Sequence, residues 1–329
     1  MAVTDRDKPV RVGVVKFASC DGCQLGFLDI GPALLDIGIK YQIIEFGEAS
    51  SHRTPEGPFD ILFVEGSIST AEQAQHIRHL RDRASLLVTI GACATSGGIQ
   101  ALRAWAGNDG GIAGFVDAVY ATPAYVDTLE RAQPVAELVE VDAELRGCPI
   151  DTGQLVELLT ATAIGRRPQL PSEAVCVTCK RAGRVCVMVA RGEPCLGPII
   201  ANGCGALCPG MARGCYGCFG PRESANGGSL ADWYASSLGL SDESVAAKFA
   251  GFTAWAPELR EVIDARGGPP GMRATEAVRS AGAVGLAGAV EPAEAAAAAG
   301  AAGLAGAAGA PGLAGVVNPE AARPEGGVA

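Results

Sequence analysis

The chain has 329 residues, with 26 Lys or Arg against 36 Asp or Glu, so its formal net charge is −10. This length allows a substantial core, and the acidic balance lacks the basic footprint of a nucleic-acid-binding protein, so we expect no nucleic-acid partner. The first residues, MAVTDRDKPVRVGVVKF, contain no apolar stretch of signal-peptide length, which predicts a cytoplasmic protein. Cytoplasmic thiols stay reduced, so the 12 cysteines are expected to bind metal rather than to form six disulfides.

Composition divides the chain into four predicted parts. They are an α/β domain (8–168), a cysteine- and glycine-rich region (169–222), a helical segment (223–270) and a low-complexity Ala/Gly-rich tail (271–329). The tail composition is typical of disorder. Within the tail, Ala295 to Val317 is uncharged and long enough to cross a bilayer, but Ala and Gly gain little free energy there, so membrane insertion is the disfavoured alternative.

The first part predicts a parallel sheet. Short apolar runs alternate with helical patterns, and the candidate strands are Arg11 to Phe17, Gln42 to Phe46, Ile61 to Glu65 and Leu86 to Ile90. A capping box of Ser69 and Glu72 predicts the start of one intervening helix. This alternation is typical of a doubly wound sheet, in which ligands bind beyond the carboxyl ends of the strands.

Four cysteines follow these strands. Cys20 and Cys23 lie in ASCDGCQLG after the first strand, and Cys93 lies in TIGACATSGG after the Leu86 to Ile90 run. Cys148 lies in ELRGCPID, after the apolar run from Glu137 to Val141. We expect all four at one edge of the sheet, where four thiolates could hold a tetrahedral zinc or a cubane iron–sulfur cluster. Neighbouring glycines would allow the close approach of bulky sulfides: Gly22, Gly91, Gly97 and Gly147.

Two alternatives remain at this point. The four cysteines could be unrelated small hydrophobes, and Cys20-x2-Cys23 fits zinc as well as iron, so spacing alone does not separate the metals.

The remaining eight cysteines form one dense segment. They are Cys176, Cys179, Cys186, Cys195, Cys204, Cys208, Cys215 and Cys218, with gaps of 2, 6, 8, 8, 3, 6 and 2 residues. The nearly palindromic run, with its Cys204-x3-Cys208-Pro209 step, is typical of a two-cluster ferredoxin, although two zinc knuckles are an alternative. Because the segment has few apolar residues, metal ligation would supply much of its folding free energy.

These motifs together resemble a known family. The strings FASCDGCQLGFLDI, VEGSIST, IGACATSGGIQ, RGCPID, VCVTCKRAGRVC and GEPCLGPIIANGCGALCPGMARGCYGC are similar to the small (delta) electron-transfer subunit of cytoplasmic, bidirectional NAD(P)-coupled nickel–iron hydrogenases, also called sulfhydrogenases. The resemblance covers roughly Val10 to Arg266. A more distant similarity links the first domain to the 20 kDa subunit of respiratory NADH:quinone oxidoreductase.

The resemblance implies a fold, cofactors and partners. The fold would be a flavodoxin-like, doubly wound α/β domain with a small ferredoxin-like region. Cys20, Cys23, Cys93 and Cys148 would hold a proximal 4Fe-4S cluster facing the nickel–iron site of a separate large subunit, and the eight later cysteines would hold two further 4Fe-4S clusters. Electrons would pass on to flavin- and iron–sulfur-containing diaphorase subunits that reduce NAD(P).

Other acceptors remain possible alternatives: a deazaflavin, a heterodisulfide reductase or a quinone. A non-catalytic zinc or cluster scaffold is an alternative from another class. The sequence identifies no catalytic acid, base or nucleophile.

Glu65 and the three histidines are the other side chains considered for a role near the metal. Glu65, at the end of a predicted strand, is interpreted either as a carboxylate beside the proximal ligands, with a role in proton relay, or as a solvated or helix-terminal charge. His52, His76 and His79 are expected on the surface without metal.

Overall fold

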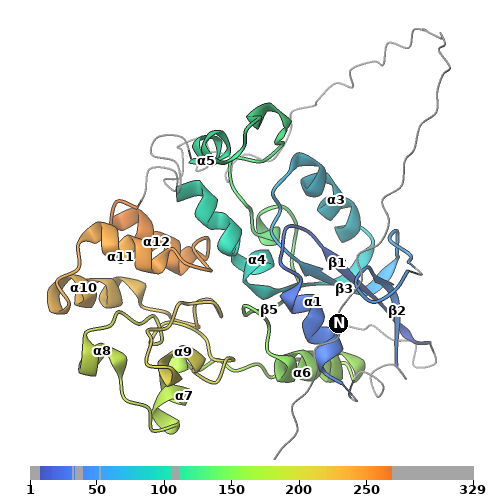
Figure 1. Ribbon diagram of the computed structural model, residues 1–329. Coiled ribbons are helices and arrows are strands. Elements are labelled where there is room, and N and C mark those ends of the chain that lie inside the picture. The colour runs from blue at the N-terminus through green and yellow to red at the C-terminus, as the bar shows by residue number, and fades with distance from the viewer. Residues whose placement is uncertain (1–7, 32, 34–39, 52, 106–110, 269–329) are drawn as a thin grey trace, which may run out of the picture. The chain divides into compact units, whose positions relative to one another are not determined.

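The computed structural model describes residues 8–31, 33, 40–51, 53–105 and 111–268 (Figure 1). The predicted tail, including Ala295 to Val317, and His52 lie outside the described residues. Within the described part of the chain, no helix has the length and apolar character needed to span a membrane.

A five-stranded parallel sheet organises the first part of the chain. Its strands are β1 (Val10–Lys16), β2 (Tyr41–Phe46), β3 (Phe59–Glu65), β4 (Ala84–Ile90) and β5 (Ala143–Leu145), in the order β2-β1-β3-β4-β5. This is the flavodoxin-like order of a doubly wound sheet, so the predicted fold class is confirmed. The central strand β3 reads as a continuous apolar run because helices cover both faces of the sheet.

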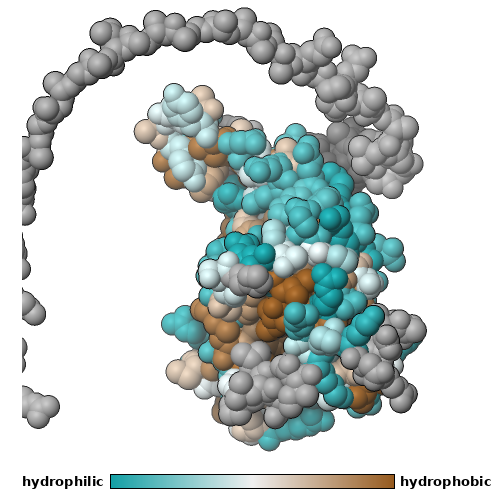
Figure 2. Space-filling view, turned by 90° about the vertical axis from the view of Figure 1, so that its right-hand side faces the viewer, coloured by the Kyte–Doolittle hydropathy of each residue, from teal (hydrophilic) through white to brown (hydrophobic). Residues whose placement is uncertain are grey.

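The two faces have separate cores. On one face, helices α1 (Gly22–Asp29) and α6 (Thr152–Ala163) bury Phe27 and Leu155 against β1 and β3. On the other face, α3 (Ala71–Arg81) buries Ile77 and Leu80 against β3 and β4. The face of the molecule on the side of β2 is largely hydrophilic, with an apolar patch near its centre (Figure 2).

Two details of the sequence prediction were wrong. Helix α3 has Thr70, not Ser69, as its N-cap: Thr70 Oγ1 accepts from the Gln73 N–H at 3.2 Å, and Gln73 Oε1 accepts from the Ser69 N–H at 2.8 Å. The apolar run from Glu137 to Val141 is not a strand. It is irregular chain after the turn η3 (Val135–Glu137), and its side chains pack on the α3 face of the sheet, so the fifth strand forms later, at β5.

Shorter elements follow the strands. They are α4 (Gly91–Ser96), η1 (Ile99–Trp105), α5 (Gly111–Val119) and η2 (Pro123–Tyr125).

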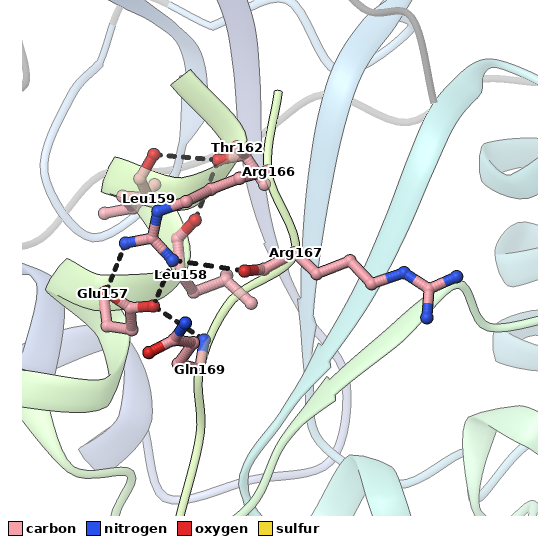
Figure 3. Close-up of polar contacts among 7 residues, drawn as sticks. All are labelled: Glu157, Leu158, Leu159, Thr162, Arg166, Arg167 and Gln169. Atoms are coloured by element: carbon pink, nitrogen blue, oxygen red, sulfur yellow. Dashed lines mark hydrogen bonds and ion pairs between the residues drawn. The ribbon is translucent and has the colours of Figure 1, made fainter. Parts of the chain in front are cut away.

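The far end of α6 lies near the amino ends of the strands (Figure 3). There Arg166 holds Glu157 with two hydrogen bonds of 2.6 and 2.7 Å, which together with the Gln169 N–H lower the pKa of Glu157 to about 2. A cavity of about 230 Å³ beside this pair is lined by the strand residues Val10, Ile61 and Leu86. This edge of the sheet is opposite the one from which the loops carrying Cys20 and Cys93 emerge.

The cysteine-rich region has three short helices: α7 (Val175–Arg181), α8 (Val187–Arg191) and α9 (Leu207–Gly210). Three more helices follow in the segment that the sequence predicted to be helical: α10 (Gly227–Ser237), α11 (Asp242–Phe249) and α12 (Pro257–Ala265). Gly239, at φ +67°, follows the end of α10 and separates that helix from α11. Pro257 stands at the first position of α12 and marks where that helix begins.

The cysteine-rich region and these helices share one core. Leu196 and Ile200, from the cysteine-rich region, are each 1% exposed and belong to the same apolar cluster as Tyr234 and Phe249 of α10 and α11. The region therefore has more apolar burial than its own sequence suggests.

Candidate functional site

Four thiols meet at the carboxyl edge of the sheet. Cys20 lies in the loop after β1, Cys23 in the first turn of α1, Cys93 in α4 and Cys148 in the turn after β5. Burial, with the charges of Cys148 and Cys20, raises the pKa of Cys93 to about 11, while the hydrogen bond to Gln100 opposes the rise. Burial raises the pKa of Cys23, and the charges of Cys93 and Cys148 contribute to the rise. The structure thus brings together the four residues that the sequence predicted, which we call the sheet-edge thiols.

Two glycines make room beside these sulfurs. A Cβ on Gly91 would lie 2.4 Å from Cys23 Sγ, and one on Gly98 would lie 2.5 Å from Cys93 Sγ. Both glycines have positive φ, +83° and +66°, a backbone conformation that other residues rarely adopt. These positions therefore need glycine both for the backbone and for access to sulfur, as a bulky sulfide-containing group at the thiols would require.

The other predicted glycines act differently. A Cβ on Gly22 would be in ordinary contact with Cys20 Sγ, at 3.5 Å. Gly97 instead leaves room for Trp255, whose Cδ1 would lie 2.4 Å from an added Cβ, and a Cβ on Gly147 would meet the Pro149 carbonyl oxygen of its own turn at 2.5 Å. Both Gly97 and Gly147 have positive φ, +81° and +142°, so glycine is needed there for the backbone of the turn, and the nearest atoms to an added Cβ are not sulfurs.

Glu65 is buried beside Cys23. Its side chain is 2% exposed, and Oε1 accepts from the Cys23 N–H at 3.2 Å. Burial raises the pKa of Glu65, while Gln24 and the Cys23 N–H oppose the rise. Neither Oε2 nor Gln24 Nε2 makes a hydrogen bond of normal geometry. The interpretation of Glu65 as a solvated loop carboxylate is wrong, since it lies at the start of α1 among the sheet-edge thiols.

Gln100 also contacts this group. Its Oε1 lies 3.3 Å from Cys93 Sγ, and its Nε2 donates to the Ala18 carbonyl. Gln100 thereby ties the α4 thiol to the loop that carries Cys20. Its place at the end of IGACATSGGIQ gave no sign of this role in the sequence.

The eight later cysteines form two groups of four. Burial, together with the charges of the neighbouring Cys195, Cys179 and Cys186, raises the pKa of Cys176 to about 11. We call these four the outer thiols. Burial, together with the charges of Cys204, Cys148 and Cys208, raises the pKa of Cys218 to about 12.

Burial raises the pKa of Cys215, and so do the charges of Cys195, Cys218 and Cys204, so Cys215 has neighbours in both sets. Its Cys-x2-Cys spacing assigns it to the set of Cys218. We call Cys204, Cys208, Cys215 and Cys218 the inner thiols. The sequence left this division open.

The three groups follow one another in space. The charge of Cys148, one of the sheet-edge thiols, raises the pKa of Cys218, one of the inner thiols. Cys215 of the inner thiols donates its N–H to Cys195 Sγ of the outer thiols at 3.1 Å. The arrangement is therefore sheet-edge, inner, outer. A Cβ on Gly197 would lie 3.3 Å from Cys195 Sγ and 3.5 Å from Cys176 Sγ, so glycine again borders two thiols.

Tyr234 is a feature that sequence reasoning missed. The side chain is fully buried, its ring packs edge-on against Phe249 with centroids 6.1 Å apart, and its hydroxyl has no hydrogen-bond partner. Burial raises the pKa of Tyr234, and so do the charges of Cys195, Cys215 and Cys176. An unpaired hydroxyl buried beside thiols of two groups is costly unless an acceptor occupies the space there. No sequence motif marks this residue.

The two described histidines lie on α3. His76 and His79 are exposed on α3, where His79 Nε2 lies 2.8 Å from Glu56 Oε2. All twelve cysteines are free thiols in the structure. Among the residues described, no three His, Cys, Asp or Glu side chains are grouped so as to hold a single metal ion.

Comparison with known proteins agrees with this architecture. Residues 20–162 match the family described as NADH ubiquinone oxidoreductase, 20 Kd subunit. The chain is 33% identical over 249 residues to sulfhydrogenase 2 subunit delta of Pyrococcus furiosus, a match that covers 75% of this chain and 100% of that one. It is 28% identical over 247 residues to one of the subunits of the F420-non-reducing hydrogenase of Methanothermobacter marburgensis, covering 64% of this chain and 79% of the relative.

A third relative is the NAD-reducing hydrogenase HoxS subunit delta of Cupriavidus necator. It is 28% identical over 179 residues, covering 51% of this chain and 85% of the relative.

The class defined by these findings is an oxidoreductase subunit with an α/β sheet domain and three groups of thiols. The chain belongs to the family of hydrogenase small, electron-transfer subunits that includes these three relatives.

Proposed function

We propose that this chain is the iron–sulfur electron-relay subunit of a nickel–iron hydrogenase. The observation that carries the proposal is the division of all twelve cysteines into three neighbouring groups of four, two of them bordered by glycines whose Cβ would meet sulfur. Thiolates in sets of four are the ligands of 4Fe-4S clusters. We assign one cluster each to the sheet-edge, inner and outer thiols.

The clusters, when bound, would accept and donate single electrons. The chain's own residues set the conditions for this. The sheet edge positions Cys23 at the start of α1, where the Cys23 N–H is held by Glu65. The shared core around Leu196 excludes water from Cys195 and Cys215, each 5% exposed. The Gly217 N–H donates to Cys215 Sγ at 3.4 Å, and such bonds tune the potential of a cluster.

The family implies a hydrogenase large subunit as partner. We place its nickel–iron site beyond the sheet-edge thiols and the electron exit at the outer thiols. We further propose a flavin- and iron–sulfur-containing diaphorase module as acceptor, with NAD(P) as its substrate, because one relative is an NAD-reducing hydrogenase subunit. A cytoplasmic location is part of the same proposal.

A second candidate keeps the relay and changes the acceptor. Relatives that are subunits of F420-non-reducing hydrogenases favour keeping this alternative with a heterodisulfide reductase or a quinone as acceptor. A deazaflavin, the third acceptor considered, gains no support from them, because coenzyme F420 is itself a deazaflavin. Reduction of NAD(P) by dihydrogen in the purified complex separates the two. A zinc or cluster scaffold without electron flow is tested by metal and sulfide analysis.

The decisive experiment compares two cysteine variants in the assembled complex prepared without oxygen. In Cys93→Ser, we expect the inner and outer clusters to assemble but dihydrogen to leave them oxidised, because the sheet-edge ligand set is incomplete. In Cys215→Ser, we expect loss of an inner signal in paramagnetic resonance while the sheet-edge cluster is still reduced by dihydrogen. Parental NAD(P) reduction by Cys93→Ser, or a folded protein with stoichiometric zinc and no sulfide, would contradict the proposal.

A further inference from the structure

Arg184 lies in the turn that ends α7. Gly183, at φ +65°, lets the chain reverse there, and the Arg184 N–H donates to the Cys179 carbonyl at 3.1 Å. This hydrogen bond closes a Schellman turn, which fixes the backbone of Arg184 beside the outer thiol Cys179. The side chain of Arg184 therefore begins at a defined place within the outer group.

The guanidinium of Arg184 reaches α9, the short helix that carries the inner thiol Cys208. It donates to the Ala206 carbonyl, which also accepts from the Gly210 N–H at 3.0 Å in the first turn of α9. Helices α7 and α9 accordingly lie next to each other (Figure 1). Arg184 thus connects the outer thiols to the helix of an inner thiol.

Two backbone features of α9 accommodate this guanidinium. A Cβ on Gly210 would lie 2.0 Å from a terminal nitrogen of Arg184 and 2.4 Å from its Cζ, so glycine leaves the space that the guanidinium occupies. Ala206 has φ +56°, a conformation that residues other than glycine rarely adopt, and it is fully buried. Strained backbone of this kind persists where the surrounding contacts hold it, and Arg184 supplies one of those contacts.

Among the residues that the structure describes, no carboxylate pairs with Arg184, whereas its neighbour Arg181 pairs with Glu173. Arg184 is half-buried, and a partly buried cation is costly unless negative charge lies nearby. Burial and the charge of Cys195 raise the pKa of Cys179, and the charge of Arg184 opposes the rise. The outer thiols, once they act as ligands, are therefore a source of negative charge that balances Arg184.

We propose that the Arg184 guanidinium, held over Gly210 and the Ala206 carbonyl, raises the midpoint potential of the outer cluster. This inference rests on the proposed relay. Reduction adds one electron to a group that four thiolates already make negative, and a fixed cation nearby stabilises the added charge. Solvent and salt screen a half-buried cation less than an exposed one such as Arg181. The outer cluster therefore holds an electron more strongly than it would without Arg184, which favours electron flow toward the exit of the relay.

Removal of the charge is the first test. Variants of the full chain are assembled with the large subunit without oxygen and titrated by paramagnetic resonance, and the outer signal is the one that Cys176→Ser removes. In Arg184→Gln we expect reduction of the outer cluster to become about tenfold less favourable, a potential lower by about 59 mV for a one-electron couple, with the other potentials unchanged. Arg184→Lys keeps the cation and should keep most of the parental potential. The matched control Arg181→Gln removes the same charge from an exposed, paired guanidinium and should behave as the parental complex.

Displacement of the guanidinium is the second test. Gly210 is a helical residue of α9, so in Gly210→Ala the new Cβ pushes the end of the Arg184 side chain away while the charge is kept. The outer potential should fall, as in Arg184→Gln, and the double variant should show little further fall because both changes remove the same interaction. The matched control is Gly228→Ala in α10, where nothing lies within 4 Å of an added Cβ, and it should keep the parental potentials.

Iron and acid-labile sulfide per chain distinguish a shifted potential from a lost cluster. An unchanged outer potential in Arg184→Gln and Gly210→Ala at full iron content would overturn the inference and leave the relay standing. An equal fall in Arg184→Gln and Arg184→Lys would also overturn it, because the charge would then not be the cause. If Arg184→Gln loses iron, the potential of Gly210→Ala decides. Absence of cluster signals in the parental complex would overturn the relay, and the inference with it.

Discussion

Replacement of Gly91 by alanine tests the sheet-edge site most directly. The new Cβ would lie 2.4 Å from Cys23 Sγ, whereas carbon and neighbouring heavy atoms pack at about 3.5–4.0 Å, so the sulfur must move by about 1 Å or more. Ligand sets tolerate displacements of only about 0.5 Å. The positive φ of +83° adds a backbone cost of about 1–2 kcal/mol.

The matched control is Gly165→Ala. Gly165 belongs to the same α/β domain and has φ +71°, but nothing lies within 4 Å of an added Cβ. It therefore carries a similar backbone cost without a contact to sulfur. Gly165→Ala should lose about 1–2 kcal/mol of unfolding free energy from the backbone alone, and Gly91→Ala should lose at least as much.

The assay is iron and acid-labile sulfide per chain, with paramagnetic resonance of the assembled complex. Gly91→Ala should lose about one third of its iron, all from the sheet-edge cluster, since each proposed cluster holds the same number of irons. Gly165→Ala should keep its full content. Equal iron content in the two variants would refute the reasoning, because the steric contact with Cys23 would then have no bearing on ligation.

Three other outcomes are expected. Tyr234→Phe removes the unpaired hydroxyl beside the outer and inner thiols. Redox titration should therefore show one midpoint potential lowered by about 40 mV for each 1 kcal/mol of lost hydrogen bonding, with the iron content unchanged. The control variant Tyr125→Phe should keep all midpoint potentials of the parental complex. Glu157→Gln should speed amide hydrogen exchange at the end of α6. Because the pKa of Glu157 is lowered to about 2, this difference should be full above the ordinary value of 4.5 and shrink as pH falls toward 2. A chain ending at Gly271 contains all 12 cysteines, so it should retain its iron and its large subunit; loss of either would contradict the predicted boundary.

Strand periodicity and the placement of cysteines were sufficient to predict the sheet and the sheet-edge thiols. The apolar runs before Cys20 and Cys93 are complete strands buried on both faces, so their pattern is unambiguous. The run from Glu137 to Val141 has three apolar residues among five and packs on the sheet without strand pairing, and the pairing with β4 is made by Ala143–Leu145 instead. Apolar character alone does not distinguish these outcomes.

The grouping of the eight later cysteines could not be predicted for a different reason. Sequence spacing predicts that residues as close in the chain as Cys176 and Cys179 lie near each other. Cys195 lies near Cys176 because the chain folds back at Gly197, which borders both sulfurs, and spacing does not predict this. Tyr234 was missed because its role depends on where α10 packs. A single tyrosine in a helix carries no signal of the thiols that lie beside its hydroxyl.

The cysteine-rich region also changes the expected role of metal in folding. Its few apolar residues suggested that ligation supplies most of the folding free energy, yet Leu196 and Ile200 are almost fully buried against α10–α12. Burial of each such side chain contributes about 1.5–3 kcal/mol, so the three helices stabilise the region independently of metal. Cys215 lies in this same core, and burial raises the pKa of Cys215 above the usual thiol range. Without metal it is therefore a neutral thiol that packs as a small hydrophobe, and ligation must displace its proton. The helices thus hold Cys195 and Cys215 in the shared core, and the proposed clusters would bind at thiols that apolar packing already positions.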